Sequence, residues 1–143
     1  MAGEPPCYAH LLTEAGLMPD QPRVIIQRVY EVGAIGIGKR ILVDRVWPRG
    51  IKRETLRLDA WLRDLAPSDE LRKWFGHDPN RWDDFQQRYI AELKEPSRQA
   101  QLAELIDLAR YEPVTLLYGA RDEMHNQAVV LRFVVEAALA RGE

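Results

Sequence analysis

Two short apolar segments, residues 41–43 and 114–117, are each followed at once by charged and polar side chains, in residues 44–50 and 118–126. Short apolar runs bounded in this way are typical of buried strands. In an open α/β sheet, side chains that follow the carboxyl ends of the strands converge in the crevice where ligands bind. We therefore expect residues 44–50 and 118–126 to form one functional site.

The first of these polar groups belongs to the one strongly basic segment of the chain. Residues 39–53 hold one acid, Asp44, against six cations: Lys39, Arg40, Arg45, Arg49, Lys52 and Arg53. Arginine presents a planar fork that binds carboxylate or phosphate at two points, and Trp47 offers a flat face for a base or sugar. This pattern indicates an anion-binding site. The alternative is that Trp47 and Pro48 pack in the core and that the cations form a solvated loop.

The second polar group precedes the last helical segment, about residues 124–140. Asp122 is placed to cap this helix, whose free N–H groups and dipole favour an anion, and Arg121 would reinforce that site. His125 and Asn126 would then lie in its first turn, where a histidine can transfer protons near neutral pH. The alternative is that Asp122 is only a cap and His125 a surface residue.

These segments supply the candidate functional residues. The candidate acid and base residues are Asp44, Tyr118, Asp122 and His125. The candidate ligand-binding residues are Arg45, Trp47, Arg49, His77, Arg121 and Asn126.

A metal site is not indicated. His77 and Asp78 lie in a loop whose shape Pro79 restricts, and they could combine with Asp122 or His125. These ligands lack a recognised metal-binding spacing, so we predict neither a metal nor another cofactor. The single cysteine, Cys7, can form no disulfide within the chain.

Composition indicates one soluble domain. The chain has 143 residues, of which 46% are hydrophobic, and a net charge of -2. We expect a single α/β domain over residues 23–143, preceded by a proline-containing leader, residues 1–22. The charge balance argues against general nucleic-acid binding. No apolar stretch approaches the roughly 20 residues that span a bilayer, so we expect a cytoplasmic protein that does not associate with membranes.

The periodicity predicts an α/β fold, a small three-layer-like domain with a short sheet of about three or four strands flanked by helices. A glycine-containing link joins strands near residues 24–32 and 41–43. It is too short for an ordinary parallel crossover, so these strands are either antiparallel or not immediate neighbours. Residues 114–118 are predicted to form a further strand. Five helices are predicted. The first begins at Thr55 and is ended by Pro67, the second is capped by Ser68 and ended by Gly76, and the third is capped by Asn80 and stopped by Pro96. The fourth is opened by Ser97, and the fifth is the last helical segment, about residues 124–140.

On these residues the chain resembles the YeaO-like branch of the bacterial family called domain of unknown function 488. The resemblance is carried by residues 42–50 (Leu-Val-Asp-Arg-Val-Trp-Pro-Arg-Gly), together with segments 65–68, 71–79, 81–82, 88–89, 92–93 and 115–126. It implies an α/β fold and a site at the strand ends, while the activity of the family is not established. Tyr118 stands where the main branch has a cysteine, and Asn126 lies near its Cys-His-Arg motif, so thiol chemistry does not carry over.

Three hypotheses follow. The leading one is an enzyme, a hydrolase or group transferase that acts on an anionic small molecule or nucleotide. In it, Arg45, Arg49 and Arg121 hold the anionic group. The second is a non-catalytic module that senses a ligand or docks on a protein. The third is local nucleic-acid contact through residues 39–53, which predicts binding that weakens steeply with salt.

Overall fold

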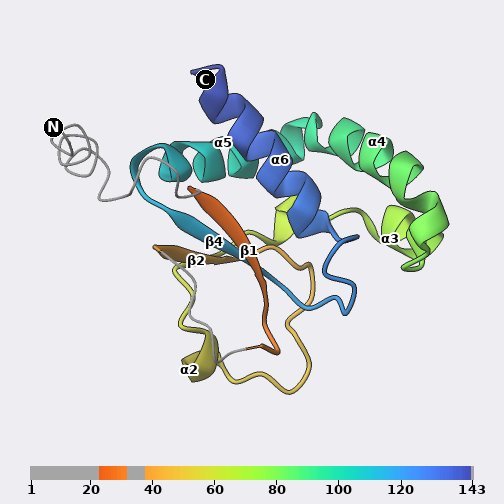
Figure 1. The fold of residues 1–143 in the computed structure, drawn as a ribbon, viewed down its shortest axis with the longest axis horizontal. Helices are drawn as coiled ribbons and strands as arrows, with labels where there is room; N and C mark the ends of the chain where they lie inside the picture. Colours follow the sequence, from red (N-terminus) through yellow and green to blue (C-terminus); the bar gives the residue numbers. More distant parts are fainter. Residues whose placement is uncertain (1–22, 32–37, 143) are drawn as a thin grey trace, which may run out of the picture.

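A four-stranded parallel sheet organises the structure, a computed structural model that describes residues 23–31 and 38–142 (Figure 1). Its order is β1-β4-β2-β3, and all three pairings are parallel. The strands are β1 (Val24–Arg28), β2 (Lys39–Leu42), β3 (Ala60–Trp61) and β4 (Val114–Tyr118). Together with its helices, this sheet confirms the predicted small α/β fold.

The first two strands are not neighbours, because β4 lies between them. Thr115 of β4 is in register with Ile25 of β1 on one side and with Arg40 of β2 on the other. The second of the two predicted arrangements is therefore confirmed. Both strands are parallel to β4, so they run in the same direction.

Strand β4 is buried along its whole length because both faces of the sheet are covered. Val114, Leu116 and Tyr118 belong to the main hydrophobic core, in which the sheet packs against α3, α4, α5 and α6. Leu117 points to the opposite face, into a second cluster with Leu56 of α2. This alternation follows from the two-residue period of a strand. Figure 1 shows α5 and α6 on one side of the sheet and α2 on the other.

The α-helices are α2 (Arg53–Leu56), α3 (Asp69–Phe75), α4 (Trp82–Leu93), α5 (Pro96–Tyr111) and α6 (Gln127–Ala140), with 3₁₀ turns η1 (Arg63–Leu65) and η2 (Pro79–Arg81). The predicted bounds of α3 are confirmed. The Ser68 side chain accepts a hydrogen bond from the Leu71 N–H at 3.1 Å, and Gly76 ends the helix at a left-handed φ of 54°.

The prediction of one helix that begins at Thr55 and is ended by Pro67 is wrong. Arg57 adopts a left-handed conformation and ends α2, and β3 then pairs with β2. Trp61 packs on the second cluster while Leu62 lies in the main core, so adjacent side chains point to opposite faces as in a strand. The helical spacing of the leucines in this segment does not reflect a helix, because the pairing with β2 decides the local conformation.

Two further helix starts differ from the predictions. Asp78, rather than Asn80, caps the turn before α4, since its side chain accepts a hydrogen bond from the Asn80 N–H at 3.0 Å. Pro96 is the first residue of α5 rather than only the end of α4. Proline is tolerated at the first helical position because its missing N–H has no partner there.

The predicted leader, residues 1–22 with Cys7, lies outside the described residues, so the boundary at residue 23 stays a prediction. In the part of the chain that the structure describes, no helix has the length and apolar character needed to cross a membrane.

We predict that Gly38→Ala is far more destabilising than Gly50→Ala. Both glycines have a left-handed φ, 58° and 79°, which costs an alanine about 1–2 kcal/mol. A Cβ at Gly38 would lie 1.8 Å from the Pro113 carbonyl oxygen, which accepts the Lys39 N–H, whereas nothing lies within 4 Å of a Cβ at Gly50. Urea unfolding should show a loss of about 3 kcal/mol or more for Gly38→Ala. Equal losses in the two variants would contradict this packing of β2 against the start of β4.

Candidate functional site at the carboxyl ends of β2 and β4

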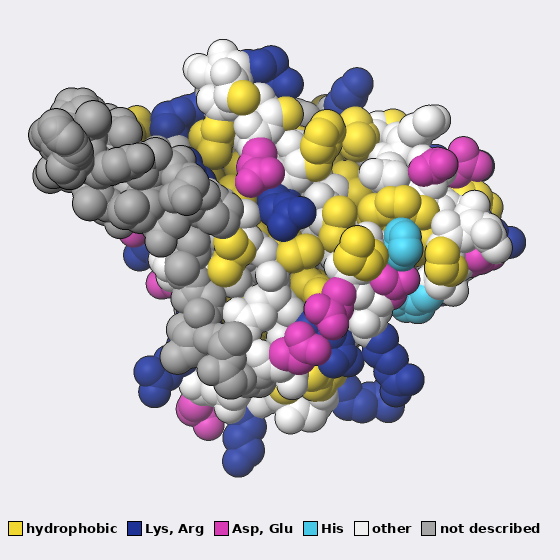
Figure 2. All heavy atoms as spheres, viewed as in Figure 1, with side chains coloured by type: hydrophobic (Ala, Val, Ile, Leu, Met, Phe, Trp, Pro, Cys, Tyr) yellow, Lys and Arg dark blue, Asp and Glu magenta, His cyan; other side chains and the backbone are white. Residues whose placement is uncertain are grey.

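A pocket of about 300 Å³ lies where β2 and β4 end. The segment after β2 contributes Asp44 and Arg45, the segment after β4 contributes Gly119 and His125, and α3 contributes Arg72. On the face drawn in Figure 2, histidine side chains lie beside acidic and apolar ones. The pocket therefore combines groups from the two segments that the sequence singles out, together with a residue that it does not.

The Asp44 carboxylate connects three elements. Its Oδ2 accepts a hydrogen bond from the Gly119 N–H at 2.9 Å, and its Oδ1 accepts one from the side-chain amide of Gln127, the first residue of α6. The Asp44 carbonyl accepts a bond from the Trp61 Nε1 at 2.7 Å. Asp44 thereby fixes the exit of β2 relative to the exit of β4 and the start of α6.

Burial dominates the electrostatics of Asp44. Loss of solvation raises the pKa of its carboxyl from 3.8 to about 6, against the smaller lowering effects of the two hydrogen bonds and of the Arg72 charge. The sequence predicts that an external anion binds at the start of the last helix. In the structure, the protein's own carboxylate is hydrogen-bonded to the first residue of α6. The positive end of the helix dipole favours that charge.

Asp122 does not cap α6, in contrast to the prediction. Asn126 is the cap, since its Oδ1 accepts hydrogen bonds from the N–H groups of Ala128 and Val129 at 2.9 and 3.3 Å. The helix thus begins three residues later than predicted, and neither His125 nor Asn126 lies in its first turn. The asparagine lies directly before the helical residues, where its side chain reaches their N–H groups.

Asp122 instead closes the preceding turn and holds His125. Its Oδ1 accepts the N–H groups of Met124 and His125 at 2.9 and 3.1 Å, and its Oδ2 lies 2.8 Å from the His125 Nδ1. The hydrogen bond with His125 is the largest of the effects that lower the pKa of Asp122. The edge of Trp82 contacts the imidazole, with ring centroids 5.1 Å apart. His125 is thus held at the pocket through its Nδ1, and its Nε2 is not bonded to Asp122.

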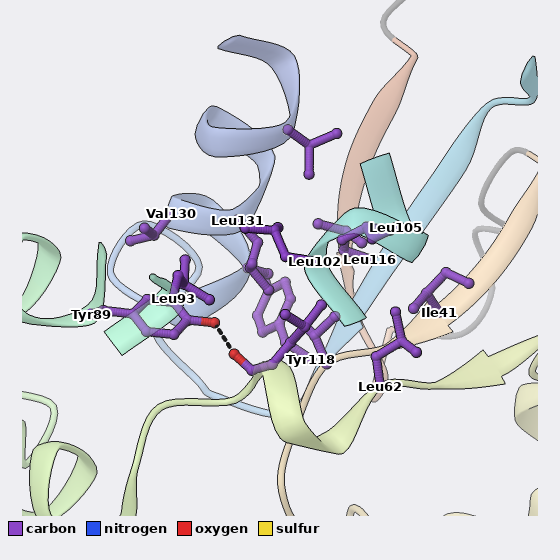
Figure 3. Packing of buried hydrophobic residues seen from close by; sticks show 14 of the residues in the cluster. Ile41, Leu62, Tyr89, Leu93, Leu102, Leu105, Leu116, Tyr118, Val130 and Leu131 are labelled. Carbon is purple, nitrogen blue, oxygen red and sulfur yellow. Dashed lines mark hydrogen bonds between the residues drawn. The ribbon is translucent and has the colours of Figure 1, made fainter. Parts of the chain in front are cut away.

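Ala66 and Pro67 form the opposite wall of the pocket, and each residue from Leu65 to Ser68 is held by a side chain from another part of the chain. The bonds are those of Tyr89 Oη to the Leu65 carbonyl (Figure 3, dashed line), Arg98 Nε to the Ala66 carbonyl at 3.4 Å, Arg45 Nε to the Pro67 carbonyl at 3.4 Å, and the Ser68 N–H to Glu92 at 2.8 Å. Arg98 is almost fully buried. Because α4 and α5 fix this wall from behind, the pocket is formed without a ligand.

The remaining predicted site residues are distributed as follows. His77 lines the pocket at a left-handed φ of 58°. Tyr118 lies in the main core, where burial raises the pKa of its hydroxyl. Trp47 packs edge-on against Trp61 in the second cluster and donates its Nε1 hydrogen to the Ile51 carbonyl. Arg49 and Arg121 are exposed and do not line the pocket.

Several cations of the basic segment have partners within the protein. Lys39 lies 3.9 Å from Asp59, Arg40 donates to the Leu56 carbonyl at 2.6 Å, and the Arg53 guanidinium lies over the Trp47 ring. Arg45 lines the pocket and lies 3.9 Å from Asp69. The segment is thus spread over both faces of the sheet rather than gathered in one patch.

No group of three or more His, Cys, Asp or Glu side chains is placed to hold a metal within residues 23–31 and 38–142.

Sequence reasoning did not single out Arg72, Gly119 or Gln127 as site residues, although all three line the pocket. Gly119 could have been predicted from the sequence, because it comes directly after the buried strand. A Cβ there would lie 3.0 Å from the Asp44 Oδ2, so the glycine permits the close approach of its N–H to the carboxylate. Arg72 could not have been predicted, since a single arginine on a short helix does not indicate which neighbours it faces.

We predict that Asp44 makes the protein less stable as the pH rises. A folded-state pKa of about 6, above the usual 3.8, means that the native state binds more protons in this window. The stabilisation is fully present below pH 3.8 and is lost as the pH rises through about 6. The free energy of unfolding of the wild type minus that of Asp44→Asn should fall across this window by at most about 3 kcal/mol.

Asp122→Asn is the control with the opposite sign, because the pKa of Asp122 is lowered and its stabilisation is lost as the pH falls. Denaturant unfolding between pH 2 and 8 measures both difference curves, because the change that Asp122 causes falls below pH 3.8. A flat curve for Asp44→Asn would mean that this carboxyl is not desolvated in the folded protein.

Comparison with known proteins agrees with the resemblance drawn from the sequence. The chain is 43% identical over 105 residues to the uncharacterized protein YeaO of Escherichia coli (strain K12), which covers 73% of this chain and 90% of that protein. It is 43% identical over 114 residues to the uncharacterized protein Rv3073c of Mycobacterium tuberculosis (strain H37Rv), covering 80% and 94%. No solved structure matches the chain. A family model described as the inactive DUF488-N3 subclade matches residues 23–143, and the chain therefore belongs to this subclade of the domain of unknown function 488 family.

Proposed function

We propose that this protein is a non-catalytic binding module that holds a small anionic molecule in the pocket at the ends of β2 and β4. The observation that carries the proposal is the convergence of Arg45 and Arg72 on a pocket with a fixed wall. Guanidinium groups bind phosphate and carboxylate through paired hydrogen bonds. A volume of about 300 Å³ suits a small metabolite.

The two arginines are held near one another by a shared acid. Arg72 lies 3.1 Å from the Asp69 Oδ1, and Arg45 lies 3.9 Å from the same oxygen. Both side chains are partly exposed, at 30% for Arg45 and 49% for Arg72, so a ligand can reach them. Asp69 neutralises one of the two charges, and both guanidinium groups keep N–H donors that an anion can use.

The chemistry of the pocket favours binding over catalysis. None of the described residues that line it is a serine, threonine, cysteine or lysine, the usual nucleophiles of covalent catalysis. Tyr118, at the position of a cysteine in the main branch, lies in the core instead. The description of the subclade as inactive points in the same direction.

Acid and base catalysis by His125 is the second candidate function. The Asp122 carboxylate lies within hydrogen-bond distance of the His125 Nδ1 and orients this imidazole at the pocket. Hydrolysis or transfer of a bound anionic group would use His125 as the base and Asp44 as the acid.

The binding proposal predicts that Arg45→Ala and Arg72→Ala each weaken the binding of inorganic phosphate and of adenosine monophosphate, with adenosine as the neutral comparison. Loss of one charge-assisted contact should weaken binding about 10- to 100-fold. Thermal unfolding in the presence of each compound measures this, because a ligand at 100 times its Kd adds about 2.7 kcal/mol to stability.

Arg110→Ala is the matched control. Arg110 forms the same i,i+3 ion pair with an aspartate as Arg72 does, at 3.2 Å, but lies on α5 away from the pocket. It should leave phosphate binding unchanged. Equal binding by all three arginine variants, or no stabilisation of the wild type by either anion, would overturn the proposal.

Turnover separates the two candidate functions. Under the binding proposal, wild-type protein and His125→Asn hydrolyse p-nitrophenyl phosphate at the same background rate. Hydrolysis by the wild type that His125→Asn abolishes would instead establish the catalytic function.

A further inference from the structure

We infer that the ligand of this pocket carries a protonated amine in addition to its anionic group, and that the amine binds the Asp44 carboxylate while Arg45 and Arg72 bind the anion. This inference rests on the proposed function and deepens it. The ligand class is a small zwitterion, an aminoalkyl phosphate or an amino acid.

The first argument is the unused hydrogen-bonding capacity of Asp44. An ionised carboxylate offers about four acceptor positions. Among the described residues, the Gly119 N–H and the Gln127 amide use two of them. The carboxylate also lines the pocket, so a ligand N–H group can reach what remains.

The second argument is that Asp44 has no cationic partner. Within the described residues, no Lys, Arg or His nitrogen lies within 4.0 Å of its carboxylate, and both arginines of the pocket pair with Asp69 instead. Arg72 acts on it only through a longer-range attraction. A partly buried carboxylate without a paired charge is costly. A ligand ammonium group would supply the missing charge.

The third argument is the cost of a ligand that is only anionic. Such a ligand would place a second negative charge in the same small pocket as Asp44, in surroundings where like charges repel strongly. The apolar side chains Val46, Pro48 and Phe75 also line the pocket and suit a short hydrocarbon linker between the two charged groups. The pocket thus offers positive groups, a negative group and an apolar wall to one molecule.

Two matched pairs of compounds test the inference by isothermal titration calorimetry at pH 8. Phosphoethanolamine is compared with ethyl phosphate, and β-alanine with propionate, so that each pair differs by the amine. We expect the amine to improve the Kd at least tenfold in one pair or both, since hydrogen bonds to charged groups are of this strength. The better pair identifies whether phosphate or carboxylate is the anionic group.

Asp44→Asn gives a result of opposite sign for the two members of a pair. Asparagine can still accept the Gly119 N–H and can donate to the Gln127 amide oxygen after that amide turns over. The variant should bind phosphoethanolamine more weakly and ethyl phosphate more tightly than the wild type does. Asp107→Asn, which removes the partner of Arg110 on α5, should change neither.

The outcomes distinguish the inference from the function on which it rests. If ethyl phosphate or propionate binds and the amine adds nothing, the inference is overturned and the anion-binding function stands. If none of the four compounds binds the wild type, both fail. A loss of binding to both members of a pair in Asp44→Asn, without the change of sign, would show that Asp44 only supports the pocket.

Discussion

The site depends on the hydrogen bonds that the Asp44 carboxylate accepts from Gly119 and Gln127. These bonds bring together the ends of two strands and the start of α6, which are distant in the sequence. They are possible because β4 lies beside β2, so that Gly119 follows the sheet next to Asp44. The burial that makes the arrangement compact also disfavours the charged form of Asp44 and raises the pKa of its carboxyl.

The opposite wall is fixed by a different means. Side chains from α4 and α5 hold the backbone of Leu65 to Ser68 from behind. Residues such as Arg98 and Glu92 therefore have polar partners inside the structure and do not contact the pocket. A preformed wall lowers the cost of ordering side chains and loops when a ligand binds. The pocket is thus suited to recognition of a rigid or short molecule.

Sequence patterns predicted those features that depend on local chemistry. The strand exits follow from short apolar runs, and the bounds of α3 follow from Ser68 and Gly76. Features that depend on tertiary contacts were missed. β3 forms because residues 60–61 pair with β2, Trp47 packs against Trp61, and Arg72 reaches the pocket through the placement of α3. No spacing in the chain encodes these contacts, whereas a glycine directly after a buried strand, as at Gly119, does indicate a close approach.

The central claim is that the ends of β2 and β4 form one anion-binding pocket. The most direct measurement is a two-dimensional NMR titration of isotope-labelled protein with phosphoethanolamine. The account predicts that the Gly119 amide, the Gln127 side-chain amide and the Nε groups of Arg45 and Arg72 shift together with one Kd. Shifts confined to surface arginines such as Arg110, or no shifts at Gly119 and Arg72 at millimolar ligand, would contradict it.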